Sequence, residues 1–102
     1  MASRLELHEE LCALLGSRHV YFQPPETVKM TYPAIRYVRD GGAEMRADDK
    51  FYKFKRRYTV TVITKDPDQE IGFSILKHFP YCRMERNYIA DNLNHEVLLL
   101  YY

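Results

Sequence analysis

Residues 58–64, YTVTVIT, constrain the fold more strongly than any other stretch of this sequence. Successive side chains of a β-strand point to opposite faces, and this stretch alternates in that way. One face would carry Tyr58, Val60 and Val62, and the residues between them would form the other face. Aromatic and β-branched residues are also the types that strands favour. The stretch therefore predicts a strand with Val60 and Val62 in the core.

An amphipathic helix is predicted over roughly residues 4–15. Ser3 and Glu6 form an S-x-x-E capping box, in which each side chain accepts a hydrogen bond from an amide that the first turn leaves free. Leucines then recur at helical spacing, and Gly16 can take the left-handed conformation that ends a helix.

A second helix is predicted after residue 65. Asp66 is a favoured N-cap, and Pro67 would occupy the first helical position, where its missing N–H costs nothing. An apolar i, i+4, i+8 line begins at Ile71. The helix would end before Pro80.

Four further stretches have strand character: HVYFQ at 19–23, YPAIRYVRD at 32–40, YCRMERNY at 81–88 and HEVLLLYY at 95–102. Gly41 and Gly42 are expected to end the second of these, which leaves a long loop at about residues 40–54. The order is helix, strand, strand, long loop, strand, helix, strand, strand. It predicts an α+β fold with a mostly antiparallel or mixed sheet of four to five strands and two helices on one face.

One domain is predicted over residues 1–102, because this length is usual for a single core. A composition of 46% hydrophobic and 28% charged residues excludes a disordered chain and a membrane span. Acidic residues near the N-terminus favour intracellular synthesis over a signal peptide. The predicted core contains Leu11, Leu15, Ile35, Val60, Val62, Ile75, Phe79 and Leu99.

The sequence contains few residues that could perform catalysis or bind a metal. His8 and Cys12 are spaced to share one helix face, but Cys12 stands where an H-E-x-x-H zinc site has its second histidine. Cys82 with His78 or His95 lacks a third orienting group. We therefore expect no catalytic, cofactor or metal site and no enzymatic activity, with both cysteines reduced.

A basic stretch, Lys50–Arg57, has aromatic residues between its cations, as in surfaces that bind single-stranded nucleic acid. However, the formal net charge of the chain is only +1, and strand alternation would divide the cations between two faces. A β-ladder with outward Lys and Arg is the favoured interpretation, and a small nucleic-acid-binding module is the alternative.

The segments LCALLG, VYFQPPE, YPAIRY, KRRYTVTVITKDPD and CRMERNYIADNLNHEVLLLYY, in this order, resemble the tail terminator or tail completion proteins of long-tailed bacteriophages and prophages. The resemblance covers nearly the whole chain. It implies an α+β virion structural protein that closes the head-proximal end of the tail tube and joins the tail to the head connector. A head-closure or connector protein of the same neck assembly is the alternative that it leaves open.

The partners that the resemblance implies are further copies of the chain in a ring, usually of six, the tail tube protein and a head-closure or connector protein. No membrane partner or catalytic residue is implied, and assembly would take place in the host cytoplasm.

The long loop is the predicted contact surface, because aromatic residues, Met and Arg suit protein interfaces. Its predicted contact residues are Met45, Arg46, Phe51, Tyr52 and Phe54. Its lysines, predicted to face the passage through which DNA leaves the head, are Lys50, Lys53 and Lys55.

Overall fold

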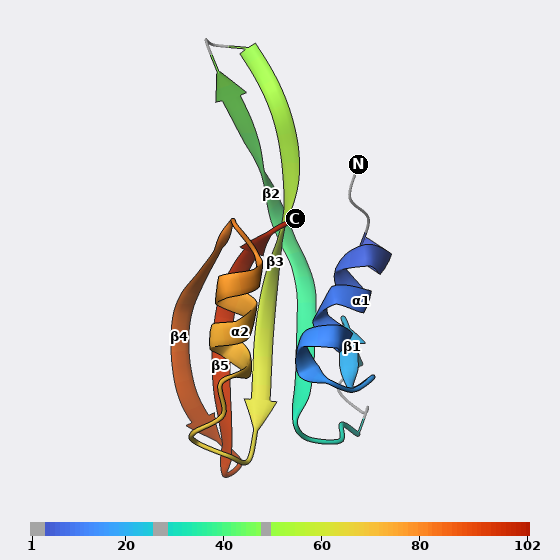
Figure 1. Ribbon diagram of the computed structural model, residues 1–102, viewed down its shortest axis with the longest axis vertical. Helices are drawn as coiled ribbons and strands as arrows, with labels where there is room; N and C mark the ends of the chain where they lie inside the picture. Colours follow the sequence, from blue (N-terminus) through green and yellow to red (C-terminus); the bar gives the residue numbers. More distant parts are fainter. Residues whose placement is uncertain (1–3, 26–28, 48–49) are drawn as a thin grey trace.

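A computed structural model describes residues 4–25, 29–47 and 50–102, and the side chains of residues 42–55 lie outside that description. The described residues form two helices and five strands (Figure 1). Their bounds are α1 Arg4–Leu15, β1 Val20–Phe22, β2 Ala34–Ala47, β3 Lys50–Thr64, α2 Ile71–His78, β4 Cys82–Ala90 and β5 Leu93–Tyr101. The predicted α+β class is confirmed.

The strands form one mixed sheet in the order β1-β2-β3-β5-β4. β1 runs parallel to β2, whereas the other neighbouring pairs are antiparallel. The short β1 lies at one edge of the sheet and is followed by Pro24 and Pro25, which cannot donate a hydrogen bond to a ladder. β4 forms the other edge and is joined to β5 by Asp91 and Asn92, whose φ angles of 52° and 61° suit a two-residue hairpin.

α1 and α2 cover the same face of the sheet, as predicted (Figure 1). The strand register aligns Tyr37, Val60 and Leu98 across this face, and all three are fully buried. Leu7 of α1 and Ile75 of α2 pack against the same cluster. The predicted core residues that belong to it are Leu11, Ile35, Val60, Val62, Ile75 and Phe79.

Two residues of the predicted core are not members of this buried cluster. Leu15, at the end of α1, packs against the core but is only partly buried. Leu99 is buried on the opposite face of the sheet, where it pairs with Thr59, while Leu98 and Leu100 face the helices. Because several consecutive residues of β5 are apolar, alternation alone does not indicate which of them face the core.

The predicted long loop at about residues 40–54 is wrong. β2 continues through Gly41 and Gly42 to Ala47, and β3 begins at Lys50, so the segment consists of two paired strands. Gly41 lies at a shift in register and has a φ of 145°, a conformation that favours glycine. Here the glycine accompanies a β-bulge and does not end the strand.

α1 has the predicted bounds, and Gly16 follows it with a φ of 82°. The Gly16 N–H donates to the carbonyl oxygen of Cys12 at 2.9 Å, which closes the helix. The predicted capping box includes Ser3, which lies outside the described residues.

α2 begins later than predicted, at Ile71 and not after Asp66. The carboxylate of Asp66 accepts a hydrogen bond from the Asp68 N–H at 2.9 Å, which forms a turn in place of a helix start. The side chain of Gln69 then accepts the Ile71 N–H at 2.6 Å and satisfies an amide of the first helical turn.

Candidate functional site

The outer part of the β2–β3 hairpin projects beyond the helices and the rest of the sheet (Figure 1). We call its residues 42–47 and 50–55 the arm. Among the described residues, the arm strands pair only with each other. The pairing of β1 with β2 ends at Tyr37, and the pairing of β5 with β3 ends at Arg57, before the arm begins. The molecule is accordingly elongated, with extents of 48 × 24 × 23 Å. The arm therefore carries two open strand edges.

The structure brings all the predicted contact residues onto the arm. In the backbone register Met45 lies opposite Lys53, and Arg46 lies opposite Phe51. The register shifts between these two pairs, which leaves Tyr52 as the extra residue of an irregularity. Phe54, Lys50 and Lys55 also belong to the arm. Because their side chains lie outside the described part of the structure, the contact role of these residues stays a prediction.

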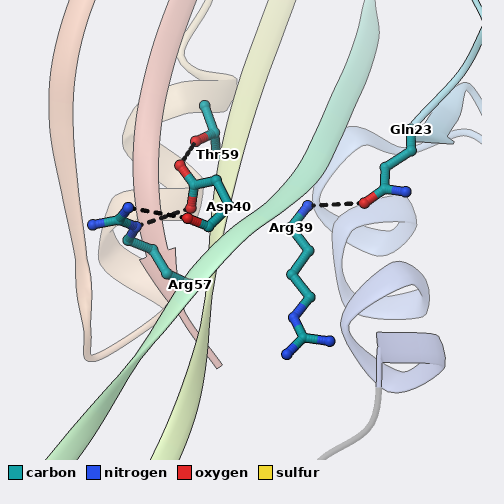
Figure 2. Close-up of polar contacts among 5 residues, drawn as sticks. All are labelled: Gln23, Arg39, Asp40, Arg57 and Thr59. Atoms are coloured by element: carbon teal, nitrogen blue, oxygen red, sulfur yellow. Dashed lines mark hydrogen bonds and ion pairs between the residues drawn. The ribbon is translucent and has the colours of Figure 1, made fainter.

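A polar cluster fixes the base of the arm. Asp40 has no partner in the β2–β3 register, because Arg39 pairs with Tyr58 and Gly41 with Arg57. The Asp40 carboxylate accepts hydrogen bonds from Arg57 Nε, at 2.9 Å, and from the hydroxyl of Thr59 (Figure 2). Arg57 Nη2 also donates to the carbonyl oxygen of Asp40 at 3.1 Å. We call Asp40, Arg57 and Thr59 the clasp.

The clasp combines a charge pair with hydrogen bonds at a partly exposed site. The side chains of Arg57 and Asp40 are 38% and 32% exposed. Partial burial alone would raise the pKa of Asp40, but hydrogen bonds from Thr59 and Arg57, together with the guanidinium charge, hold it below its ordinary value. Asp40 is therefore ionised at neutral pH and holds the two strands in one register where the arm begins.

Gln23 closes the outer side of the same base. Its backbone N–H donates to the carbonyl oxygen of Tyr37 at 2.9 Å, and its side-chain oxygen accepts the Arg39 N–H at 3.3 Å (Figure 2). Gln23 has a positive φ of 44° and directly follows β1, which ends at Phe22. The edge of β2 is thus occupied up to Arg39.

Tyr102 connects the arm base to α1 and to Phe79, the residue that follows α2. Its backbone exchanges two hydrogen bonds with Arg56, at 2.9 and 3.2 Å. Its hydroxyl donates to the carboxylate of Glu10 on α1, and its ring lies 5.9 Å from that of Phe79, centroid to centroid. Burial and the bond to Glu10 raise the pKa of Tyr102, so the hydroxyl keeps its proton. The direction of the arm is therefore coupled to the helical layer.

Of the two residues considered for metal binding, Cys12 is buried in the core and the partly buried His8 contacts a core tyrosine. His8 Nδ1 lies 2.8 Å from the hydroxyl of Tyr37, to which Arg4 donates at 3.3 Å. Burial, followed by the charges of Arg18 and Arg4, lowers the pKa of His8, so the imidazole is neutral and accepts the Tyr37 proton. The part of the chain that the structure describes contains no group of three or more His, Cys, Asp or Glu suited to a metal ion.

The residues considered for nucleophilic catalysis also have other partners. Cys82 is a free thiol, and burial raises its pKa to about 11, so little thiolate forms at neutral pH. His78 Nε2 lies 2.9 Å from the carboxylate of Glu10. The ring of His95 stacks on that of Tyr88, with centroids 4.7 Å apart.

No protein-family model matches this sequence, and a search of curated proteins found no significant match. No helix within residues 4–25, 29–47 and 50–102 is long and apolar enough to cross a membrane.

Proposed function

We propose that this chain is a virion structural protein of a long-tailed bacteriophage or prophage. It closes the head-proximal end of the tail tube and joins the tail to the head connector, as a ring of six copies. The proposal starts from the ordered sequence segments that resemble tail terminator and tail completion proteins. The structural observation that carries it is the arm, because a ring subunit must present surface beyond its own core.

The arm suits assembly because it is a two-stranded ribbon outside the body of the sheet. Isolated two-stranded hairpins are marginally stable in water, so a further strand or a neighbouring surface would stabilise this one. The arm sequence, GAEMRA and KFYKFK, combines aromatic residues and Met with charges of both signs. This composition is typical of protein interfaces.

The clasp suits a ring because ring closure depends on the angle between subunits. Head-to-tail contacts form a closed ring only if the rotation from one subunit to the next is constant. Asp40, Arg57 and Thr59 fix the β2–β3 register where the arm leaves the body, while Tyr102 connects the arm base to α1. Every copy would therefore present its arm in the same direction.

The proposed role requires no catalytic chemistry, and we expect no enzymatic activity. Lys50, Lys53 and Lys55 would add a sequence-independent positive charge to the passage through which DNA leaves the head. A head-closure or connector layer of the same neck would use the arm in the same way.

The experiment is complementation of particle assembly. An extract that lacks this protein should accumulate separate heads and tails, and addition of the purified chain should restore joined particles and infectivity. Normal joining without the protein would contradict the proposal. So would a chain that remains monomeric and binds oligonucleotides with a steep salt dependence, which is the behaviour of a nucleic-acid-binding module.

A further inference from the structure

Two of the exposed large hydrophobic side chains of the described residues lie next to each other in sequence near the end of β4. Tyr88 is 41% exposed and Ile89 is 74% exposed, and both belong to β4. Tyr81, which is 40% exposed, directly precedes the strand. The other two large hydrophobic residues in this class are Leu5 on α1 and Phe73 on α2. An exposed Ile on an edge strand is a feature that soluble proteins usually avoid.

The end of β4 also lacks the protection that edge strands usually have. Among the described residues, β4 pairs with β5 on one side and leaves its other edge open. A register shift at Glu85 separates the charged first half of β4 from the second half. After Arg86, the segment 87–90, NYIA, contains no charge and no proline. Its backbone is therefore available to pair with an added strand.

We propose that segment 87–90 of one subunit accepts the arm of the next subunit as an additional strand. The proposal rests on the proposed ring function and specifies how the ring closes. The occupant is a second copy of this chain because the arm offers a complementary row of unpaired backbone groups. Pairing would add a third strand to the arm and would cover Ile89.

The arm cannot reach the β4 edge of its own subunit. The register places Tyr88 beside His95 and Ile63, whereas the arm begins beyond Arg57, farther along β3 in the opposite direction. Figure 1 shows the arm at one end of the long axis and the end of β4 near the other. The contact therefore joins two different surfaces of neighbouring copies, which is the arrangement that produces rings.

Charge favours the β2 side of the arm as the strand that is added. Residues 42–47, GAEMRA, contain one acid and one base, whereas residues 50–55, KFYKFK, contain three lysines. The lysine strand would place like charges beside Arg86, which destabilises a strand pair. Addition through the β2 side leaves the lysine strand open, in agreement with its proposed exposure to DNA.

The first test places a charge on the edge. Ile89→Lys should lower the association constant of the purified protein at least tenfold, measured as oligomer mass against concentration by sedimentation. Leu5→Lys is the matched control, because Leu5 is 66% exposed but lies on α1, and this variant should assemble like the wild type. Thermal unfolding of both variants verifies that the monomer fold is intact. Wild-type assembly of Ile89→Lys would overturn the inference.

The second test identifies the occupant. Replacing Met45, Phe51 and Tyr52 with Ser gives a triple variant with a weakened arm and an intact edge, whereas Ile89→Lys has an intact arm and a weakened edge. Neither variant should form rings alone. The intact edge of the triple variant should accept the intact arm of Ile89→Lys, whereas the weakened arm of the triple variant should not bind the weakened edge of Ile89→Lys. The mixture should therefore yield a one-to-one heterodimer.

Absence of that heterodimer, with both variants folded, would overturn strand addition between copies. The ring function itself is tested separately by the wild type. If the wild type and Ile89→Lys both form rings and join heads to tails, the edge inference fails while the function stands. If the wild type joins nothing, the proposed function fails.

Discussion

Val62→Asp tests the assignment of the sheet faces and therefore the position of the helical layer. Val62 is fully buried and lies between Ile35 of β2 and Glu96 of β5 in the register. The substitution removes a buried apolar side chain, which contributes about 1.5–3 kcal/mol, and places a carboxylate in the core next to an acidic residue. An unpaired buried polar group adds several kcal/mol. The sum approaches the roughly 5–15 kcal/mol by which such a domain is stable, so we expect the variant to be largely unfolded at pH 7.

The loss of stability should depend on pH in a defined direction. Burial raises the pKa of a carboxyl group in the folded state above its unfolded value of about 3.9. The penalty is therefore full at pH values above the raised pKa and diminishes as the pH falls toward the unfolded value. Circular dichroism melts of the variant and the wild type, recorded together between pH 7 and 4, should show a smaller difference at the lower pH.

Val38→Asp is the matched control on the opposite face of β2. Val38 pairs with Thr59 and is only partly buried, so its carboxylate can reach water. We expect a loss of about 1–2 kcal/mol, which is a shift of several degrees in the melting temperature. An unchanged melting temperature for Val62→Asp, or a larger loss for Val38→Asp, would refute the face assignment.

Three further predictions concern the arm and the thiol. Gly41→Ala should cost about 1–3 kcal/mol, because alanine rarely adopts the φ of 145°, and thermal unfolding measures the loss; an unchanged melting temperature would contradict the bulge geometry. Asp40→Asn should speed amide hydrogen exchange in the arm at pH 7 more than at pH 3. Because the pKa of Asp40 is lowered, its ionised carboxylate stabilises the base of the arm above the ordinary Asp pKa, and this stabilisation is lost on acidification. Equal effects at both pH values would count against the clasp. Cys82 should react with iodoacetamide about a hundredfold more slowly in the native protein than in urea at pH 7.5, because burial raises the thiol pKa from 9.0 to about 11; equal rates would exclude the burial effect.

Local periodicity predicted most of the fold. The alternation of residues 58–64 and the leucine spacing of α1 depend on neighbouring residues, so the sequence contains the information directly. The faces of β5 were harder to predict, because Leu98 and Leu99 have similar chemistry and only the register against β3 separates them. That register is a property of the whole sheet.

The arm shows what local reasoning missed. Gly41 and Gly42 are typical of chain breaks, and the prediction of a loop followed from that tendency. In the structure the pairing of β2 with β3 outweighs the tendency of the glycines to end a strand. Asp40, which the register shift leaves unpaired, accepts hydrogen bonds from Arg57 and Thr59 across the two strands. The sequence does contain a signal, because an Asp-Gly-Gly stretch between two alternating runs is compatible with a bulged hairpin. The predicted contact residues lie on two paired strands and not on a loop, and their contact role stays a prediction.

The central claim is that copies of this chain form a ring at one end of the tail tube. The most direct measurement is native mass spectrometry of the purified protein, alone and with isolated tail tubes, followed by electron microscopy of the mixture. We predict an oligomer of about six copies, bound at a single end of each tube. A monomer that binds no tubes at any concentration would contradict the claim.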